Sequence, residues 1–265
     1  MPEKPIKAVV FDWAGTMIDF GSVAPVKAFA ETFRSFGIEV SDAEARAPMG
    51  LTKRDHIAAM LSDPRIADAW TDTHGAPAGE ADIDRMFARF VPINADVVAQ
   101  HAQLVPGAHD MLRWLADEGI KVGSTTGYTR EIMARVLPLA GAQGYVPANL
   151  VCSGDVPEGR PSPLGMYQCF VDLAVYPPSA VVKVDDTAPG IAEGIAAGCL
   201  TVGVAMSGNE VGLTVEELNA LPADERDRLR TRAADVLRKA GADHVIDTVA
   251  DLPDLLNSLK SDNPA

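Results

Sequence analysis

Residues 7–16 read KAVVFDWAGT, a short run of β-branched and aromatic side chains that ends in an aspartate and a glycine-containing turn. The apolar part, Lys7 to Phe11, has no period of 3.6 residues, which is typical of a strand buried on both faces of a sheet. We therefore predict a central parallel strand. Asp12 follows it directly, so its carboxylate should project from the carboxyl edge of the sheet, as a nucleophile, as a metal ligand or simply as the cap of a turn.

Similar short apolar runs predict further strands, most of them next to helix-like segments. They lie at residues 120–124, 150–153, 180–184, 201–204 and 244–246. Strands that alternate with helices indicate an α/β fold, here a doubly wound, Rossmann-like parallel sheet. Ligands of such sheets bind at the carboxyl ends of the strands, where the chain turns into loops.

Residues 21–101 interrupt this rhythm with helical patterns and no convincing strand. The helical patterns cover Val26 to Phe36, Lys53 to Leu61 and Ile83 to Gln100, and the Gly- and Ala-rich stretch from Asp72 to Asp82 is interpreted as a mobile connection. We expect a helical cap domain inserted after the first strand of an α/β core that comprises residues 1–20 and 102–262. A chain of 265 residues is long enough for one core and one insertion.

Composition and charge narrow the possible partners and compartment. The chain has 23 basic and 37 acidic residues, and its formal charge of −14 disfavours nucleic acid and anionic membranes as partners. A small anionic substrate remains compatible with this charge, because a local metal and a few cations can reverse the potential of a site. The three cysteines have no ligand-like spacing, and no apolar run is long enough for a secretion signal or a membrane span, so we expect a cytoplasmic protein.

Three other strand ends carry side chains suited to phosphate or metal chemistry. Residues 124–127 (STTG) offer hydroxyls and a bare amide to a phosphoryl group, and residues 159–161 (GRP) hold a guanidinium in a stiff loop. A plain strand-to-helix turn and a surface arginine are the structural alternatives. Asp185 and Asp186 are adjacent carboxylates, which are costly to place together without a cation and therefore favour Mg²⁺.

Strand ends that carry Asp, Ser/Thr, Arg and Asp-Asp in this order resemble the four motifs of the haloacid dehalogenase superfamily, whose members transfer a group through an aspartyl intermediate. Within it, five segments in order resemble the phosphonatase family. They are FDWAGT (Phe11 to Thr16), MGLTKRDHI (Met49 to Ile57), GSTTGYTREIM (Gly123 to Met133), DVPEGRPSP (Asp155 to Pro163) and KVDDT (Lys183 to Thr187). The resemblance covers the whole chain. It implies hydrolysis of phosphonoacetaldehyde to acetaldehyde and phosphate, with Mg²⁺ as cofactor, in the degradation of 2-aminoethylphosphonate.

The alanine at position 14 agrees with the chemistry that this resemblance implies. Most phosphatases of the superfamily carry a second aspartate two residues after the nucleophile, as a general acid for an alkoxide leaving group, and here that position is Ala14. Breaking a phosphorus–carbon bond instead leaves a carbanion, which requires an electron sink. A lysine Schiff base provides one, because the iminium lets the carbon leave as a neutral enamine.

Lys53 is the candidate for this amine, since it lies in the helical insertion and can close over the core as part of a lid. On a helix, Met49, Lys53 and His56 would be spaced i, i+4 and i+7 and so share a face, in surroundings that lower the pKa of the lysine. The alternative is a solvent-exposed lysine in a basic pair with Arg54.

The resemblance implies a role for each matching position. Asp12 attacks phosphorus, Lys53 forms the imine, and His56 and Tyr128 move protons. Substrate binding is assigned to Thr126, Gly127, Arg160 and Met49. Mg²⁺ is assigned to Asp12, to the backbone carbonyl of Ala14 and to Asp186.

The chain departs from the family pattern at two positions. Gly190 stands four residues after Asp186, where another acid often supports the metal, so that Asp185 is the residue able to take over this part. Ser22, at the junction of core and insertion, stands where some relatives have a cysteine, which should matter little to the chemistry.

Two other functions fit part of the pattern. A mutase or ester phosphatase would use the same scaffold, but Ala14 leaves it without an acid for the alkoxide. A phospho-accepting receiver module also pairs a strand-end aspartate with acids and Mg²⁺, but it is shorter, lacks a helical lid and carries its acid pair early in the chain. Family resemblance favours a homodimer, for which Phe29, Phe33 and Phe36 could form either the interface or a small core within the insertion.

Overall fold

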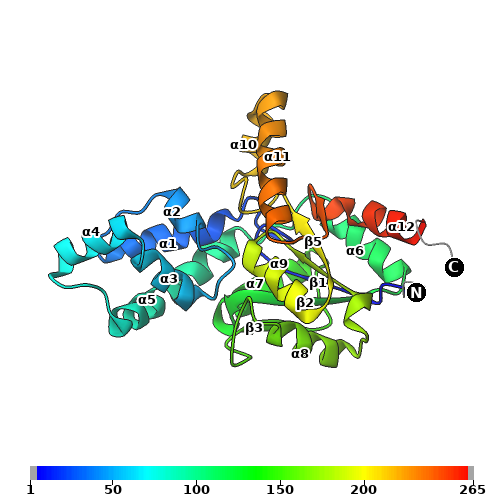
Figure 1. Cartoon of the computed structure of the whole chain (residues 1–265), viewed down its shortest axis with the longest axis horizontal. Coiled ribbons are helices and arrows are strands. Elements are labelled where there is room, and N and C mark those ends of the chain that lie inside the picture. The colour runs from blue at the N-terminus through cyan, green and yellow to red at the C-terminus, as the bar shows by residue number, and fades with distance from the viewer. Residues whose placement is uncertain (1–4, 262–265) are drawn as a thin grey trace.

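The computed structural model describes residues 5–261, and within them the predicted α/β fold is confirmed (Figure 1). A six-stranded sheet has the order β3-β2-β1-β4-β5-β6, and all neighbouring strands are parallel. The strands are β1 (Ala8–Phe11), β2 (Lys121–Thr129), β3 (Val151–Ser153), β4 (Val181–Asp185), β5 (Leu200–Val204) and β6 (His244–Ile246). Residues 1–4 and 262 of the expected core lie outside the described range.

The first strand is central because β2 pairs with it on one side and β4 on the other. Its side chains alternate between two buried clusters, as a strand covered on both faces requires. Val9 and Phe11 pack with side chains of α6 (Ala108–Asp117), α7 (Arg130–Ala142) and α12 (Leu252–Ser261). Ala8 and Val10 pack with α8 (Leu164–Leu173). The remaining core helices are α9 (Ala188–Ala197), α10 (Val215–Ala220) and α11 (Ala223–Lys239), of which α10 and α11 project away from the sheet (Figure 1).

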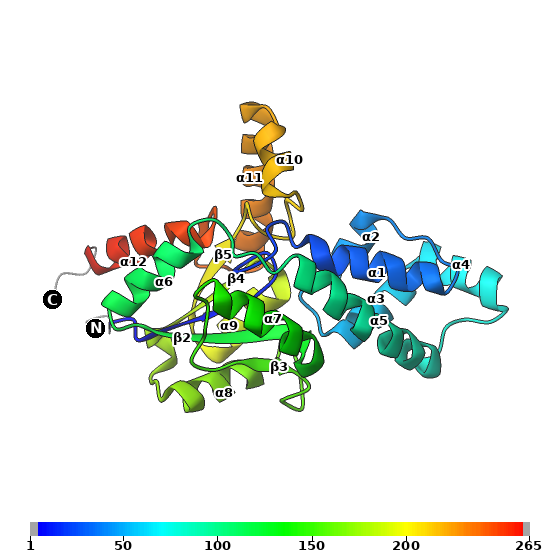
Figure 2. The same ribbon diagram turned by 180° about the vertical axis from the view of Figure 1, so that it is seen from behind.

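Five helices between β1 and β2 form a second body beside the sheet, and both views show them together (Figures 1 and 2). They are α1 (Val23–Ser35), α2 (Asp42–Arg46), α3 (Lys53–Leu61), α4 (Pro64–His74) and α5 (Glu80–Gln100). Phe29 and Phe33 are fully buried in this cap, and Phe36 stacks on Trp70 with ring centroids 5.9 Å apart. These aromatic side chains therefore form a core within the cap.

The cap differs from the sequence-based prediction between residues 72 and 82. The predicted connection there is too long, because α4 continues to His74 and α5 already begins at Glu80. Asp63 caps the start of α4 by accepting hydrogen bonds from the backbone N–H groups of Arg65 and Ile66. Gly75, with φ +81°, ends the helix in the left-handed conformation that glycine adopts easily. The irregular segment is reduced to residues 75–79.

The second strand also extends beyond the predicted residues 120–124, to Thr129. It pairs with β3 through Thr125 and again through Thr129, with a register shift between them. The threonine-rich segment therefore continues the strand where a turn had been predicted. Along the described chain, no helix combines the length and the apolar character that crossing a membrane requires.

Candidate active site

A pocket of about 330 Å³ lies where the cap meets the carboxyl ends of the strands. Its walls come from the loop after β1, from the cap and from the strand ends of β2 and β4. The lining residues are Asp12, Ala14, Ser22, Pro25, Met49, Gly50, Leu51, Lys53, Thr126, Gly127, Tyr128, Arg160, Asp186 and Thr187. The structure thus brings together every predicted site residue except His56.

The turn after β1 brings Asp12 and Asp186 close together. The Asp12 N–H donates to the Val184 carbonyl at 3.0 Å, so the pairing with β4 continues one residue past the strand. Gly15 has φ +79°, and a Cβ there would lie 2.3 Å from Asp186 Oδ2. Only glycine therefore allows this turn to pack against the Asp186 carboxylate. The Thr16 hydroxyl, one residue later, donates to Asp186 Oδ1 at 3.2 Å.

Carboxylate oxygens of Asp12, Asp185 and Asp186 lie within 4.8 Å of one another, and all three residues are buried. The Asp185 carboxylate is already balanced by cations, since Oδ2 lies 3.2 Å from Arg160 Nη1 and 3.1 Å from Lys183 Nζ. Burial would raise the pKa of Asp185, but Arg160 and Lys183 outweigh it and hold this pKa below its ordinary value.

The negative charges of the Asp12 and Asp186 carboxylates are less well balanced by neighbouring cations. Burial raises the pKa of Asp12 to about 6, against the opposing effect of Arg160. Burial, reinforced by the charges of Asp12 and Asp185, raises the pKa of Asp186 well above its ordinary value. The Asp186 oxygens accept hydrogen bonds from neutral groups, the Thr16 hydroxyl and the Asn209 amide. Two buried carboxylates in need of positive charge, with hard oxygen donors, fit a divalent cation.

Arg160 makes more contacts with protein side chains than the predicted phosphate-binding role requires. Its Nη2 lies 2.8 Å from Asp12 Oδ1 and donates to the carbonyl and hydroxyl oxygens of Thr125 at 2.8 and 2.9 Å. Its Nε donates to Glu193 Oε2 at 3.1 Å. Lys183, which is fully buried, donates from Nζ to the same Thr125 hydroxyl at 2.7 Å. This network fixes the guanidinium against the proposed nucleophile.

Sequence reasoning missed Glu193 as part of the site, and it placed Thr125 and Lys183 in segments of the site without giving either one a partner. A signal was present for two of them. Glu193 is the one charged residue of α9 (APGIAEGIAA), and Lys183 interrupts the apolar strand β4 (VVKVD). A charge in an otherwise apolar element needs a buried partner, and these two side chains pair with each other at 3.2 Å.

Lys53 is buried, with 5% of its surface exposed, which excludes the alternative of a solvent-exposed lysine. Its Nζ lies 5.7 Å from the centroid of the Phe29 ring and 5.1 Å from that of Tyr128. Burial lowers the pKa of Lys53 to about 8, although the Asp12 charge opposes this shift. About a tenth of the amine is therefore neutral at pH 7, roughly 300 times more than at the ordinary pKa of 10.5, and the neutral amine is the form that a nucleophilic lysine requires.

The predicted helical face of Met49, Lys53 and His56 is wrong, because α3 begins only at Lys53. The Thr52 hydroxyl accepts a hydrogen bond from the Asp55 N–H and caps the helix there, so Met49 lies in the turn before it. Met49 nevertheless reaches the pocket from that turn.

His56 lies behind Lys53 and does not line the pocket. It is fully buried, stacks on Phe29 with ring centroids 3.8 Å apart and donates its Nε2–H to the Ala45 carbonyl at 2.9 Å. Burial, together with the charge of Lys53, lowers the pKa of His56 well below its ordinary value. The imidazole is therefore neutral, and its Nδ1 lacks a hydrogen-bond partner among the described residues.

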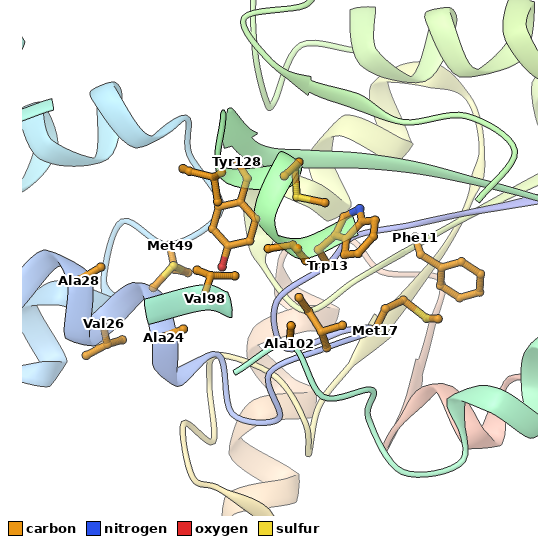
Figure 3. Packing of buried hydrophobic residues seen from close by; sticks show 14 of the residues in the cluster. Phe11, Trp13, Met17, Ala24, Val26, Ala28, Met49, Val98, Ala102 and Tyr128 are labelled. Carbon is orange, nitrogen blue, oxygen red and sulfur yellow. The ribbon is translucent and has the colours of Figure 1, made fainter. Parts of the chain in front are cut away.

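Tyr128 extends from β2 towards the cap. Figure 3 shows its hydroxyl directed towards Met49 and Val98, which belong to the same buried cluster. This hydroxyl has no hydrogen-bond partner within residues 5–261. Burial raises the pKa of Tyr128 well above its ordinary value, so the phenol stays protonated and can donate to a molecule in the pocket.

The geometry explains why glycine stands at position 190. A Cβ on Gly190 would lie 2.0 Å from the carboxyl carbon of Asp185. The Asp185 carboxylate thus occupies the space that a side chain at position 190 would need. The acid expected at position 190 and the carboxylate of Asp185 exclude each other sterically.

A parallel α/β sheet with an inserted helical cap, a strand-end aspartate and a buried acidic cluster defines a hydrolase of the haloacid dehalogenase-like class. A model of the haloacid dehalogenase-like hydrolase family matches residues 6–198.

Curated relatives define the family more closely. The phosphonoacetaldehyde hydrolase of Paraburkholderia phytofirmans is 50% identical over 94% of this chain and 93% of its own, and that of Hahella chejuensis is 47% identical over 94% and 85%. A crystal structure of a phosphonoacetaldehyde hydrolase-like protein from Oleispira antarctica has a TM-score of 0.97 and 47% identity, covering 98% of this chain and 95% of its own. The chain therefore belongs to the phosphonoacetaldehyde hydrolase family of the haloacid dehalogenase-like hydrolases.

Proposed function

We propose that this enzyme hydrolyses the phosphorus–carbon bond of phosphonoacetaldehyde and releases acetaldehyde and phosphate. The observation that carries the proposal is a buried lysine with a lowered pKa, Lys53, in the same pocket as the strand-end Asp12. The amine of Lys53 is suited to attack an aldehyde, and the carboxylate of Asp12 is suited to attack phosphorus. The names of the curated relatives support the same substrate.

The reaction begins at Lys53. Its neutral amine adds to the aldehyde carbon, and loss of water from the carbinolamine gives an imine, which is protonated to the iminium. Tyr128 is placed to donate a hydrogen bond to the departing hydroxyl, since its phenol is protonated and faces the pocket. His56 is assigned to proton transfer by its place in a segment that matches the family, and Nδ1 is the ring atom left without a hydrogen-bond partner among the described residues.

Cleavage follows at Asp12. A carboxylate oxygen of Asp12 attacks phosphorus, and the electron pair of the phosphorus–carbon bond moves into the iminium to give an enamine on Lys53. Arg160, held 2.8 Å from Asp12 Oδ1, orients the nucleophile and faces the charge that develops on the phosphoryl oxygens. Thr126 and Gly127 line the pocket beside it and are assigned to binding those oxygens.

Mg²⁺ is proposed as the cation of this site, held by Asp12, Asp186 and the backbone carbonyl of Ala14. When bound, it supplies positive charge that screens the nucleophile from the anionic phosphonate. Asp185 is assigned to the support of Arg160 and Lys183, because these cations already balance its charge.

Two hydrolyses complete the cycle. Protonation of the enamine at carbon and addition of water release acetaldehyde and regenerate Lys53, and a second water cleaves the phosphoaspartate to phosphate and Asp12. One water is lost on imine formation, so the net reaction consumes one. An ester phosphatase or mutase is disfavoured because Ala14 offers no acid to an alkoxide. A transaminase acting on 2-aminoethylphosphonate would supply the aldehyde, in the cytoplasm, to an enzyme that we expect to be a homodimer.

The test is phosphate release and intact mass after the protein is mixed with Mg²⁺ and phosphonoacetaldehyde, with and without borohydride. We expect phosphate without borohydride, and inactivation with a reduced adduct on Lys53 in its presence. Turnover of a sugar phosphate without any adduct would refute the proposal and assign Lys53 to the lid alone.

A further inference from the structure

Arg46 ends helix α2 of the cap and reaches across to the core. Its Nη1 donates to the carbonyl oxygens of Gly21 at 2.9 Å and Ser22 at 3.2 Å, in the segment that leads from β1 into the cap. Its Nη2 donates to the Gly212 carbonyl at 3.0 Å, in the core loop after β5. One side chain thus joins three parts of the chain: a cap helix, the connection into the cap and a core loop.

The same guanidinium is linked to the acidic site through Asn209. Arg46 Nη1 donates to Asn209 Oδ1 at 3.3 Å, and the Asn209 backbone N–H donates to Asp186 Oδ2 at 2.8 Å. Asn209 is buried and Arg46 is half-buried, so water competes weakly for these hydrogen bonds. The path from the cap to the proposed metal ligand therefore contains one intermediate residue.

Close packing shows that the two surfaces fit in this position of the cap. A Cβ on Gly212 would lie 2.7 Å from the guanidinium carbon of Arg46. Elsewhere between cap and core, a Cβ on Gly50 of the cap would lie 2.4 Å from the Thr187 hydroxyl, and one on Gly159 would lie 2.3 Å from a methyl group of Thr52. Glycines thus let the cap approach the core closely at all three places.

We propose that Arg46 is a positioning residue that latches the cap over the core and keeps Lys53 facing Asp12 and Asp186. The inference rests on the proposed function for its kinetic consequence, and on the contacts of Arg46 alone for its structural one. Arginine suits this role because its planar fork can donate to several oxygens at once. A lysine would keep the charge but reach fewer of the four acceptors.

The experiment compares Arg46→Met and Arg46→Lys with the wild-type enzyme. Arg34→Met is the matched control, because Arg34 is a cap arginine whose ion pair is with Glu39 of the cap. Three readouts are taken: kcat for phosphate release, the rate of the borohydride-trapped Lys53 adduct, and hydrogen–deuterium exchange of residues 47–53, 207–213 and α5.

For Arg46→Met we expect kcat and the trapping rate to fall together by about tenfold or more, as loss of several hydrogen bonds that hold the closed cap requires. Exchange should rise in residues 47–53 and 207–213 and stay unchanged within α5. Arg46→Lys should fall between Arg46→Met and the wild-type enzyme, and Arg34→Met should match the wild type.

Two results would overturn the latch. Wild-type kinetics and exchange in Arg46→Met would show that the contacts are dispensable, and faster exchange throughout α5 would assign Arg46 to the folding of the cap. Failure of the proposed function looks different, because the wild-type enzyme itself would then release no phosphate and form no adduct. The exchange measurement would still decide on the latch.

Discussion

The Lys53 amine of the cap lies 5.1 Å from the ring centroid of Tyr128, a side chain of the core sheet. Within residues 5–261 no carboxylate forms an ion pair with this amine, so its surroundings are mainly apolar and aromatic. The cap therefore contributes to the pocket a lysine whose charged form is disfavoured. The core contributes the carboxylates, Asp12 and Asp186.

The lowered pKa of Lys53 predicts the pH dependence of the reaction. The protonated amine cannot attack an aldehyde, so kcat/KM should rise about tenfold per pH unit below pH 8 and level off as pH passes the folded pKa of about 8. The profile is measured as phosphate release between pH 5.5 and 9.5 at saturating Mg²⁺. A flat profile across this range would contradict a Lys53 imine as an intermediate in turnover.

Replacing the buried lysine should separate stability from activity. A pKa that falls from 10.5 in the unfolded chain to about 8 in the folded one costs roughly 3 kcal/mol below pH 8, where both states are protonated, and this cost fades as pH rises towards 10.5. Lys53→Met removes the cost, and we expect it to raise the free energy of unfolding at pH 7 by about 1–3 kcal/mol. Urea unfolding measures this change.

The same variant should release no phosphate. Lys53→Arg serves as the control for charge, since it keeps a cation but cannot form an imine. Appreciable turnover of the aldehyde by Lys53→Arg would rule out the proposed electron sink.

Asp12→Asn should block the reaction after the imine has formed. The amide cannot attack phosphorus, so phosphate release should fall by about 10³-fold or more. Borohydride should still trap the substrate on Lys53, because that step needs no carboxylate nucleophile. Mass spectrometry of the trapped protein checks this outcome, and loss of the adduct in Asp12→Asn would show that the two steps are not separate.

A divalent cation should stabilise the folded protein through Asp12 and Asp186. At a free Mg²⁺ concentration 100 times the dissociation constant, the gain is about 2.7 kcal/mol, visible as a rise in melting temperature that EDTA reverses. Asp186→Asn should abolish the rise, whereas Asp185→Asn should keep most of it, because Asp185 is balanced by Arg160 and Lys183. Equal losses in both variants would make Asp185 a ligand as well.

Positions 185 and 190 should be energetically coupled. Gly190→Ala places a methyl group where the Asp185 carboxyl lies, and such overpacking typically costs about 1–3 kcal/mol. Asp185→Gly removes the obstacle but leaves Arg160 and Lys183 short of one partner. In a double-mutant cycle the two changes should therefore cost less together than the sum of the single losses, and additive free energies of unfolding would argue against the steric explanation.

Much of this architecture could be predicted from local patterns in the sequence. The buried strands were visible as short apolar runs, and the helical insertion was visible as a stretch without them. Asp12, Arg160 and Asp186 could be placed because each follows a strand, and parallel strands end at a common edge. Helix α3 could be placed over its full length, Lys53–Leu61, from its pattern alone.

The remaining features depend on contacts between distant residues. Met49 reaches the pocket from a turn, because Thr52 caps α3 and the helix begins at Lys53. His56 lies outside the pocket, where its ring stacks on Phe29. Glu193 and Arg46 meet partners far away in the sequence, which local periodicity does not encode. The glycine at position 190, where the family pattern has an acid, is likewise explained only by the short distance between a Cβ at this position and the Asp185 carboxyl group.

The central position of β1 in the sheet affects the order in which the fold can assemble during synthesis. Its residues, 8–11, are synthesised long before the strands that pair with it, since β2 and β4 begin only at Lys121 and Val181. The five cap helices are synthesised in between and can form while this apolar strand still has no neighbour. β4 also carries Asp185 and leads directly to Asp186, so the acidic centre cannot assemble until the nascent sheet has closed around its oldest strand.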